Sequence, residues 1–200
     1  MNTMNALDLL ATFVFALVGA RVAADRRMDW GGILFISGVA ALTGGTLRNV
    51  FLGTQPIWLQ NSNFIIAVGL AVVITIIFNI TKPIGKFLLV MDTFGLAVST
   101  VSGVQIALYL GAPRYSAVIL GLITSTAGGL LRDILCQVEP VLLHRETIGT
   151  SAVLGAIVYV LLAYSSISTN TIAIAAGSTV CIVRGLSIYF DLHLPKIKRA

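Results

Sequence analysis

Charged residues are scarce in this chain of 200 residues. Only 10% of its residues are Asp, Glu, Lys or Arg, against about 25% in typical soluble proteins, and 57% are hydrophobic. The mean hydropathy is +0.97. A water-soluble globule of this size needs a charged surface, which 13 basic and 8 acidic side chains do not supply. The composition excludes a soluble domain and predicts an integral membrane protein.

Cysteine and histidine are also rare. The two cysteines, Cys136 and Cys181, form no CxxC motif and have no metal-ligand spacing to His144 or His193, so neither a disulfide framework nor a metal site is expected. The enzyme motifs GxSxG, HExxH, GxGxxG and the P-loop do not occur. We therefore do not expect an enzyme, and we expect no cofactor.

The basic residues do not form a patch. The net charge is +5 and the pI is near 9.6, but Lys and Arg are scattered between apolar runs without interleaved aromatic residues. This pattern excludes a nucleic-acid partner and leaves the lipid bilayer as the surroundings. No Lys or Arg precedes Arg21 and no small-x-small cleavage site is present, so the first apolar run is expected to be a retained helix.

Long apolar runs fill most of the chain. A helix needs about 20 apolar residues to cross a bilayer, and short polar or proline-containing breaks divide the chain into runs of this size. The sequence predicts an all-α protein with seven transmembrane helices at residues 7–24, 30–46, 64–80, 87–110, 115–131, 148–164 and 171–190.

Most of the basic residues between the predicted helices fall on one side of the membrane. Cytoplasmic loops are rich in Lys and Arg. The N-terminus is therefore expected outside and the C-terminus in the cytoplasm of a multi-pass inner-membrane protein. The residues on the cytoplasmic side are Arg26, Arg27, Lys82, Lys86, Arg145, Lys196, Lys198 and Arg199, whereas Arg114 falls on the other side.

Two segments of the chain match each other. The sequence GGTLRN at 44–49 matches GGLLRD at 128–133, and the offset that carries Gly44 onto Gly128 also pairs Asp8 with Asp92, Gly19 with Gly103 and Pro56 with Pro140. Because each copy holds three helices, the second copy enters the membrane from the opposite face. We expect an inverted 3+3 repeat over residues 1–83 and 84–167, followed by a seventh helix and a basic tail over residues 168–200.

Each copy carries a glycine pair late in its second helix, Gly44-Gly45 and Gly128-Gly129. Each glycine destabilises a helix by about 1 kcal/mol relative to Ala, and a kink there frees backbone carbonyl groups. Carbonyl oxygens that line a wet gap are suitable ligands for a monovalent cation. We expect the second and fifth helices to be interrupted here, at the functional path. The alternative is that the glycines only permit close helix packing.

An arginine follows each glycine pair by about one turn. Arginine at membrane depth is costly unless it finds water or acceptors, so Arg48 and Arg132 either act at the path or lie at the interface and extend toward lipid phosphate. Adjacent helix residues do not face each other, so Arg132 and Asp133 are not expected to form a simple pair.

Asp8 and Asp92 are expected to cap the first turns of the first and fourth helices, where the helix dipole favours a carboxylate.

The first half begins with Leu7-Asp8-Leu9-Leu10, Phe15-Ala16 and Gly19-Ala20, and the glycine motifs read TGGTLRN at 43–49 and AGGLLRD at 127–133. Over nearly the whole chain, these motifs resemble the prokaryotic trimeric intracellular cation (TRIC) channel family, whose bacterial domain is also labelled "glycine transporter". Thr43 and Ala127 stand where the family often has another glycine, and Asn49 where Asp is commoner. The resemblance implies a seven-helix protomer, a homotrimer, and a potassium-permeable pore in each protomer between the kinked second and fifth helices.

We therefore expect a passive channel for monovalent cations. The expected path residues are the four glycines of the two pairs with Thr43, Thr46, Ser125 and Thr126, whose hydroxyl groups either line the path or bond back to the helix. The expected supporting or gating residues are Asp8, Arg48, Asn49, Asp92, Arg132 and Asp133.

An arginine and a permeant cation would repel each other in the same constriction. Two unit charges about 4 Å apart repel by roughly 4 kcal/mol at an effective dielectric of about 20. We expect the arginines beside the narrowest point, donating to freed carbonyls or to Asn49 and Asp133.

Two other functions fit the same residues. In a carrier for glycine or another small zwitterion, Arg132 would hold the carboxylate and Asp133 the ammonium group. A structural membrane scaffold would need neither role.

Overall fold

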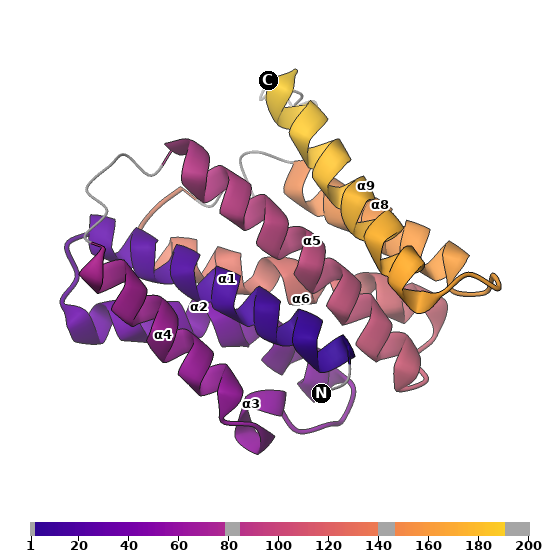
Figure 1. Cartoon of the computed structure of the whole chain (residues 1–200), viewed down its shortest axis with the longest axis horizontal. Helices are drawn as coiled ribbons and strands as arrows, with labels where there is room; N and C mark the ends of the chain where they lie inside the picture. Colours follow the sequence, from indigo (N-terminus) through magenta and orange to yellow (C-terminus); the bar gives the residue numbers. More distant parts are fainter. Residues whose placement is uncertain (1–2, 79–84, 140–146, 191–200) are drawn as a thin grey trace, which may run out of the picture.

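The computed structural model describes residues 3–78, 85–139 and 147–190. Within these ranges the chain forms eight helices and no strand (Figure 1). They are α1 (Thr3–Asp25), α2 (Trp30–Phe51), α3 (Ile57–Gln60), α4 (Asn63–Ile77), α5 (Gly85–Tyr109), α6 (Arg114–Leu135), α8 (Thr147–Leu162) and α9 (Thr169–Tyr189). Each of the seven predicted spans overlaps one of the longer helices, and α3 adds a short helix that the sequence did not indicate. The predicted basic tail, the loop residues Lys82 and Arg145, and both histidines lie outside the described residues.

Five of the described helices are long and apolar enough to cross a membrane, namely α1, α2, α5, α6 and α9. The helices α4 and α8 are apolar but shorter. Large apolar side chains such as Phe35, Ile66, Leu70 and Ile174 are exposed on the outer surfaces of the helices. The chain is therefore an all-helical membrane protein, whose exposed apolar surface suits contact with lipid.

The polar breaks end and start the helices by familiar local chemistry. Asp29 caps α2 by accepting a hydrogen bond from the backbone N–H of Gly32 at 2.7 Å, and Ser168 caps α9. Gly111 has a φ of +81° in the turn between α5 and α6, a conformation that favours glycine. Pro113 then stands at the N-cap of α6, where no backbone N–H is needed.

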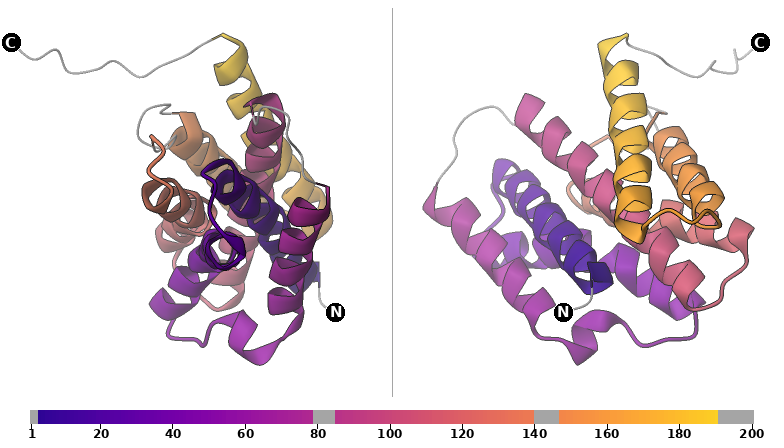
Figure 2. Two further views of the ribbon diagram at one scale, coloured as in Figure 1. Left: turned by 90° about the vertical axis from the view of Figure 1, so that its left-hand side faces the viewer. Right: turned by 45° about the vertical axis from the view of Figure 1, so that its right-hand side comes forward.

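The helices form two groups of three that pack against each other (Figures 1 and 2). In the first group α1, α2 and α4 contact one another, and in the second group α5, α6 and α8 do the same. The groups meet where α1 packs on α5 and α2 packs on α6, and α9 covers α5 and α8. The central pair α1 and α5 runs side by side, with α4 at one flank and α8 and α9 at the other.

Two reciprocal glycine contacts bring α2 and α6 together. Gly44 lies against the backbone carbonyl of Thr124, and Gly128 lies against the backbone carbonyl of Ala40; a Cβ atom on either glycine would overlap that oxygen. The repeat offset carries Gly44 onto Gly128 and Ala40 onto Thr124. The two contacts are therefore equivalent: in each, the glycine of one half meets the carbonyl of the position in the other half that corresponds to Ala40 or Thr124.

A second glycine position repeats this relation. A Cβ atom on Gly19 of α1 would lie 2.8 Å from the Cβ of Ala40, and one on Gly103 of α5 would lie 2.9 Å from the Cβ of Thr124. Ala40 and Thr124 are therefore each enclosed by glycine from two neighbouring helices.

The glycine pairs do not interrupt their helices. The helix α2 is continuous across Gly44-Gly45 and α6 is continuous across Gly128-Gly129, so the expected helix breaks with freed carbonyl groups are wrong. The low helix propensity of glycine, about 1 kcal/mol relative to Ala, is a small cost beside the packing that the close approach of two helices provides. For Gly44 and Gly128 the alternative is correct: these glycines permit close packing of α2 and α6.

Gly44→Ala is expected to lower the thermal stability of the detergent-solubilised protein, because the new methyl group has no space beside the Thr124 carbonyl. Overpacking of this kind costs about 1–3 kcal/mol. Gly38→Ala is the matched control on the same helix: nothing lies within 4 Å of its Cβ position, and the substitution gains about 1 kcal/mol of helix propensity. Thermal melts followed by circular dichroism measure both variants. Equal melting temperatures would contradict the tight contact.

Candidate functional site

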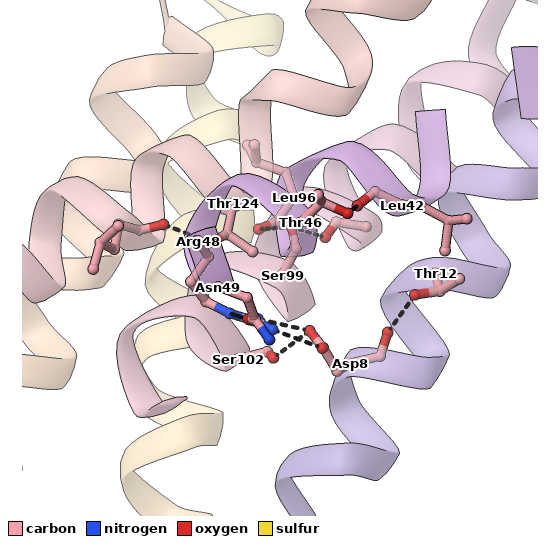
Figure 3. Close-up of polar contacts among 12 residues, drawn as sticks. Asp8, Thr12, Leu42, Thr46, Arg48, Asn49, Leu96, Ser99, Ser102 and Thr124 are labelled. Carbon is pink, nitrogen blue, oxygen red and sulfur yellow. Dashed lines mark hydrogen bonds and ion pairs between the residues drawn. The ribbon is translucent and has the colours of Figure 1, made fainter. Parts of the chain in front are cut away.

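A buried ion pair joins α1 to α2. Because these helices run antiparallel, Arg48 in the last turn of α2 lies level with Asp8 near the start of α1. The Nη1 and Nη2 atoms of Arg48 donate to Oδ1 and Oδ2 of Asp8, both at 3.0 Å (Figure 3). This bidentate geometry is the strong form of an arginine–carboxylate contact.

Two further side chains complete this group, which we call the Asp8 cluster: Asp8, Arg48, Asn49 and Ser102. The Nε of Arg48 donates to Oδ1 of Asn49 at 2.9 Å, and Oγ of Ser102 on α5 donates to Oδ1 of Asp8 at 2.8 Å (Figure 3). The amide of Asn49 donates to the backbone carbonyl of Gln55 at 2.8 Å, which ties the cluster to the chain beyond α2. Arg48 is only 1% exposed, and a charge so buried needs this full set of partners.

The second half of the chain contains an equivalent group, the Asp92 cluster of Asp92, Arg132 and Asp133. Nη1 of Arg132 in the last turn of α6 donates to Oδ1 of Asp92 on α5 at 3.0 Å. The Nε of Arg132 donates to Oδ1 of Asp133 at 2.8 Å. The side chain of Asp92 is 19% exposed, compared with 8% for Asp8. The Asp92 cluster is therefore the more open of the two, and it has a carboxylate where the Asp8 cluster has the amide of Asn49.

The clusters correct three expectations. Arg132 and Asp133 do contact each other, because the long arginine side chain folds back onto the buried carboxylate of the next residue. Arg48 and Arg132 are buried and paired rather than extended toward lipid phosphate. Asp8 and Asp92 lie beyond the first turns of α1 and α5, and they hold the arginines instead of capping the helices. The expected donation from the arginines to Asn49 and Asp133 is confirmed.

A small cavity lies beside each cluster. The Asp8 cavity, of about 20 Å³, is bordered by Asp8, Thr12, Gly45, Thr46 and Trp58 among others. The Asp92 cavity, also of about 20 Å³, is bordered by the three residues of the Asp92 cluster with Ser125, Thr126 and Gly129 among others. Each has room for about one water molecule. The cavities thus combine carboxylate and hydroxyl groups with a largely apolar wall, and they lie beside equivalent clusters in the two halves.

The two members of each glycine pair have different surroundings. Whereas Gly44 and Gly128 lie against the opposite helix, a Cβ atom on Gly45 would lie 3.7 Å from Nη2 of Arg48, and one on Gly129 would lie 3.9 Å from Nη2 of Arg132. These are ordinary contact distances. Gly45 and Gly129 therefore border the cavities without being required by close packing.

The hydroxyl groups of the predicted path residues bond back to their own helices. Thr43 donates to Val39, Thr46 to Leu42, and Ser125 and Thr126 to Leu122, at distances between the oxygen atoms of 2.7 to 3.1 Å. Thr46, Ser125 and Thr126 nevertheless border the cavities, whereas Thr43 borders neither. Back-bonding and lining thus coexist at three of the four positions, because a hydroxyl oxygen that donates still has lone pairs to offer.

Comparison with known families gives a match to the family described as glycine transporter, over residues 5–79 and 89–164. The UPF0126 inner membrane protein YadS of Escherichia coli strain K12 is 31% identical over 193 residues, which cover 94% of this chain and 93% of that protein. A UPF0126 membrane protein of Vibrio cholerae serotype O1 is 30% identical over 192 residues, which cover 94% of this chain and 80% of that protein.

Solved structures give a second line of comparison. The TRIC trimeric intracellular cation channel orthologue from Rhodobacter sphaeroides superimposes with a TM-score of 0.90 and 32% identity, covering 96% of this chain and all of the other. This chain belongs to the prokaryotic TRIC family. A further TRIC structure, solved in a study of conductance through TRIC cation channels, matches with a TM-score of 0.87 and 31% identity over 100% of this chain and 99% of that one.

Sequence reasoning missed several residues of the site in this TRIC protein. Ser102 binds Asp8, and Trp58 of α3 donates from Nε1 to Oγ1 of Thr46 at 2.9 Å, although neither belongs to a motif. The ion pairs themselves had a signal, because the separation along the chain from Asp8 to Arg48 is the same as that from Asp92 to Arg132. The shared spacing marks the two Asp–Arg pairs as equivalent, and the opposite charges, which both need partners in a membrane, are the signal that could have paired them.

Arg48→Met is expected to destabilise this TRIC protein by about 3–5 kcal/mol, because it leaves the Asp8 carboxylate buried without its cation. Asp8→Asn combined with Arg48→Met is expected to recover much of that loss, since no uncompensated charge remains. Arg114→Met on the exposed surface of α6 is the control for loss of an arginine outside the clusters; it removes only a cation–π contact with the Tyr164 ring at 3.6 Å, worth about 0.5–1 kcal/mol. Thermal melting of the three variants in detergent measures the differences. A double variant no more stable than Arg48→Met alone would contradict this explanation, because it would show that the unpaired Asp8 carboxylate does not cause the loss of stability.

Proposed function

We propose that this TRIC protein is a passive channel for monovalent cations, potassium foremost, with one path through each protomer. The observation that carries the proposal is the pair of small cavities beside equivalent buried arginine–carboxylate clusters, one in each half of the chain, each with carboxylate and hydroxyl oxygens in its wall. The similarity to TRIC cation channel structures at 31–32% identity supports it.

The cavity walls suit a small cation. Carboxylate and hydroxyl oxygens border both cavities, from Asp8, Thr12 and Thr46 on one side and from Asp92 and Ser125 on the other. Such oxygens replace water around a monovalent cation. The positive charge of each arginine is compensated by its carboxylate partners, so a cation that passes beside the cluster does not meet an isolated guanidinium.

The proposed path lies beside the crossing of α2 and α6. Gly44 and Gly128 bring the two backbones into contact and leave no space for an ion between them. This differs from the expectation of a pore directly between two kinked helices. Gly44 also borders the Asp8 cavity, but Gly45 and Gly129 border the cavities without contacting the opposite backbone, and these are the glycines that we assign to the path. The arginine clusters hold α1 to α2 and α5 to α6, and their rearrangement would widen the path.

A closed conformation fits the cavity volumes. Each cavity of about 20 Å³ holds about one water molecule, which is too little for a continuous wet path across a bilayer. Conduction then requires a second conformation in which the cavities join.

The glycine carrier is the second candidate, because the family model carries that description. Its substrate would need space for several non-hydrogen atoms, whereas the Asp92 cavity has about 20 Å³. A substrate carboxylate would also have to displace Asp92 and Asp133 from Arg132, where both already accept hydrogen bonds. These two costs favour the channel.

The proposed assembly is a homotrimer of inverted-repeat protomers in the inner membrane. The two segments matched by the family model begin at positions 5 and 89, which are related by the offset that carries Gly44 onto Gly128, and the glycine contacts between α2 and α6 exchange positions related in the same way. Both observations support the repeat. A trimer agrees with the trimeric TRIC orthologue. The loop charges favour an external N-terminus and a cytoplasmic C-terminus, which would place the Asp8 cluster toward the outside.

Purified protein in planar bilayers is expected to give discrete single-channel current steps in potassium chloride, because a passive path carries many ions per opening. The matched measurement is radiolabelled glycine uptake into proteoliposomes made from the same preparation. Saturable glycine uptake without current steps would replace the channel by the carrier. If correctly assembled protein gave neither current steps nor glycine uptake, a structural membrane scaffold would be the remaining function.

Gly129→Ala is expected to reduce the single-channel conductance without loss of stability. The added methyl group meets Nη2 of Arg132 at an ordinary distance of 3.9 Å, gains about 1 kcal/mol of helix propensity, and occupies space in the Asp92 cavity. Gly69→Ala on α4 is the control, because nothing lies within 4 Å of its Cβ position. Unchanged conductance in Gly129→Ala would remove this position from the path.

A further inference from the structure

The two cavities approach each other at one side chain. Phe15 borders both the Asp8 cavity and the Asp92 cavity, and it is the single described residue common to the two linings. It is the thirteenth of the 23 residues of α1, so it lies at the middle of the central helix. If α1 spans the membrane, Phe15 is near the bilayer midplane.

The ring of Phe15 is held between the helix groups. Phe15 is 6% exposed, and its Cε1 and Cζ atoms lie 3.4 Å from the Cβ position of Gly95 on α5. Asp8, Thr12 and Phe15 follow one another at spacings of four and three residues, so they form one stripe on α1 that faces the Asp8 cavity. The stripe begins with a carboxylate and ends with an aromatic ring.

The second half lacks an equivalent ring. The repeat offset carries Phe15 onto Ser99, which borders the Asp8 cavity and donates its hydroxyl to the carbonyl of Gly95 at 2.6 Å. Gly95 has no side chain and Ser99 has a small one, so the phenyl ring has room beside α5. A single phenyl ring therefore borders two cavities that each also present carboxylate and hydroxyl oxygens.

We propose that the Phe15 ring is the hydrophobic barrier that closes the path between the two cavities. This inference rests on the proposed channel function. An apolar constriction in a narrow path excludes water, and an ion does not enter a segment where it finds neither water nor protein oxygen. Opening then requires the ring to leave its position beside Gly95, through rotation about its side-chain bonds or a shift of α1 against α5.

Phe15→Ala tests the barrier, with potassium efflux from proteoliposomes as the readout. Where the open state of a channel is a minor state of about 0.1–10% of molecules, removal of the barrier is expected to raise efflux by about tenfold or more. Phe15→Trp is expected to lower it, because a larger ring fills the same gap. Phe15→Leu keeps an apolar packing group and is expected to give a smaller rise than Phe15→Ala.

Phe13→Ala is the matched control. Phe13 is two residues away on α1 and borders an apolar groove with Ile66 and Leu70 of α4, away from both cavities. It is expected to leave efflux unchanged. Size-exclusion chromatography and thermal melting select the folded variants. If Phe15→Ala does not fold, the efflux of Phe15→Leu relative to the wild type tests the barrier instead.

The outcomes separate the barrier from the channel. Folded Phe15→Ala and Phe15→Leu with efflux no higher than that of the wild type would overturn the barrier, whether or not the wild type conducts. A rise in Phe15→Ala and Phe15→Leu but not in Phe13→Ala supports it. The proposed function is judged separately, from single-channel steps in the wild-type protein.

Discussion

The pairing of buried charges constrains the rest of this structure. An arginine surrounded by apolar helices is stable only where carboxylate and amide acceptors meet it, and Arg48 at 1% exposure has such a set in Asp8 and Asn49. Because Asp8 is on α1 and Arg48 on α2, the pair fixes the level at which these helices cross. The same requirement sets α5 against α6 through Asp92 and Arg132. In a membrane, where apolar surface alone does not select one helix neighbour over another, the ion pairs supply that selection.

The glycine pairs then set how closely the two halves approach. The first glycine of each pair lies against a carbonyl of the opposite helix, and the second borders a cavity without such a contact, although Gly44 also borders the Asp8 cavity. Adjacent positions on a helix are separated by about 100° of rotation, so one dipeptide serves two surfaces. The Gly44-Gly45 dipeptide thus provides both the close helix contact, at Gly44, and a position without such a contact on the cavity wall, at Gly45. This explains why a pair is present where packing alone would need one glycine.

The sequence predicted the helices far better than the contacts. Apolar runs and their breaks predicted where the longer described helices lie, and five of these helices are long and apolar enough to cross a membrane, because length and hydropathy are readable from the sequence. The constant offset between the two glycine motifs predicted which positions are equivalent. It did not show that Asp8 holds Arg48, since that contact depends on the level at which two helices cross. The expected helix breaks at the glycines were wrong because propensity describes an isolated helix, whereas here the Thr124 and Ala40 carbonyls pack against the glycines.

Equivalent positions of the two halves are identical at the ion pairs and the glycine pairs, and they differ at several other positions that border the cavities. Gly44 and Gly128, Arg48 and Arg132, and Asp8 and Asp92 are identical pairs that carry the contacts between helices. By contrast, Phe15 corresponds to Ser99, Thr12 to Leu96, Thr46 to Leu130 and Asn49 to Asp133. A packing contact that is used twice tolerates change poorly, whereas a side chain that borders a cavity affects one side alone. Ala40 and Thr124 differ although Gly19 and Gly103 lie against their side chains, because the contacts with Gly44 and Gly128 are made by their backbone carbonyls. The scaffold is therefore nearly symmetric while the two compartments are chemically distinct, and a cation crossing the protein would meet a different sequence of groups in each direction.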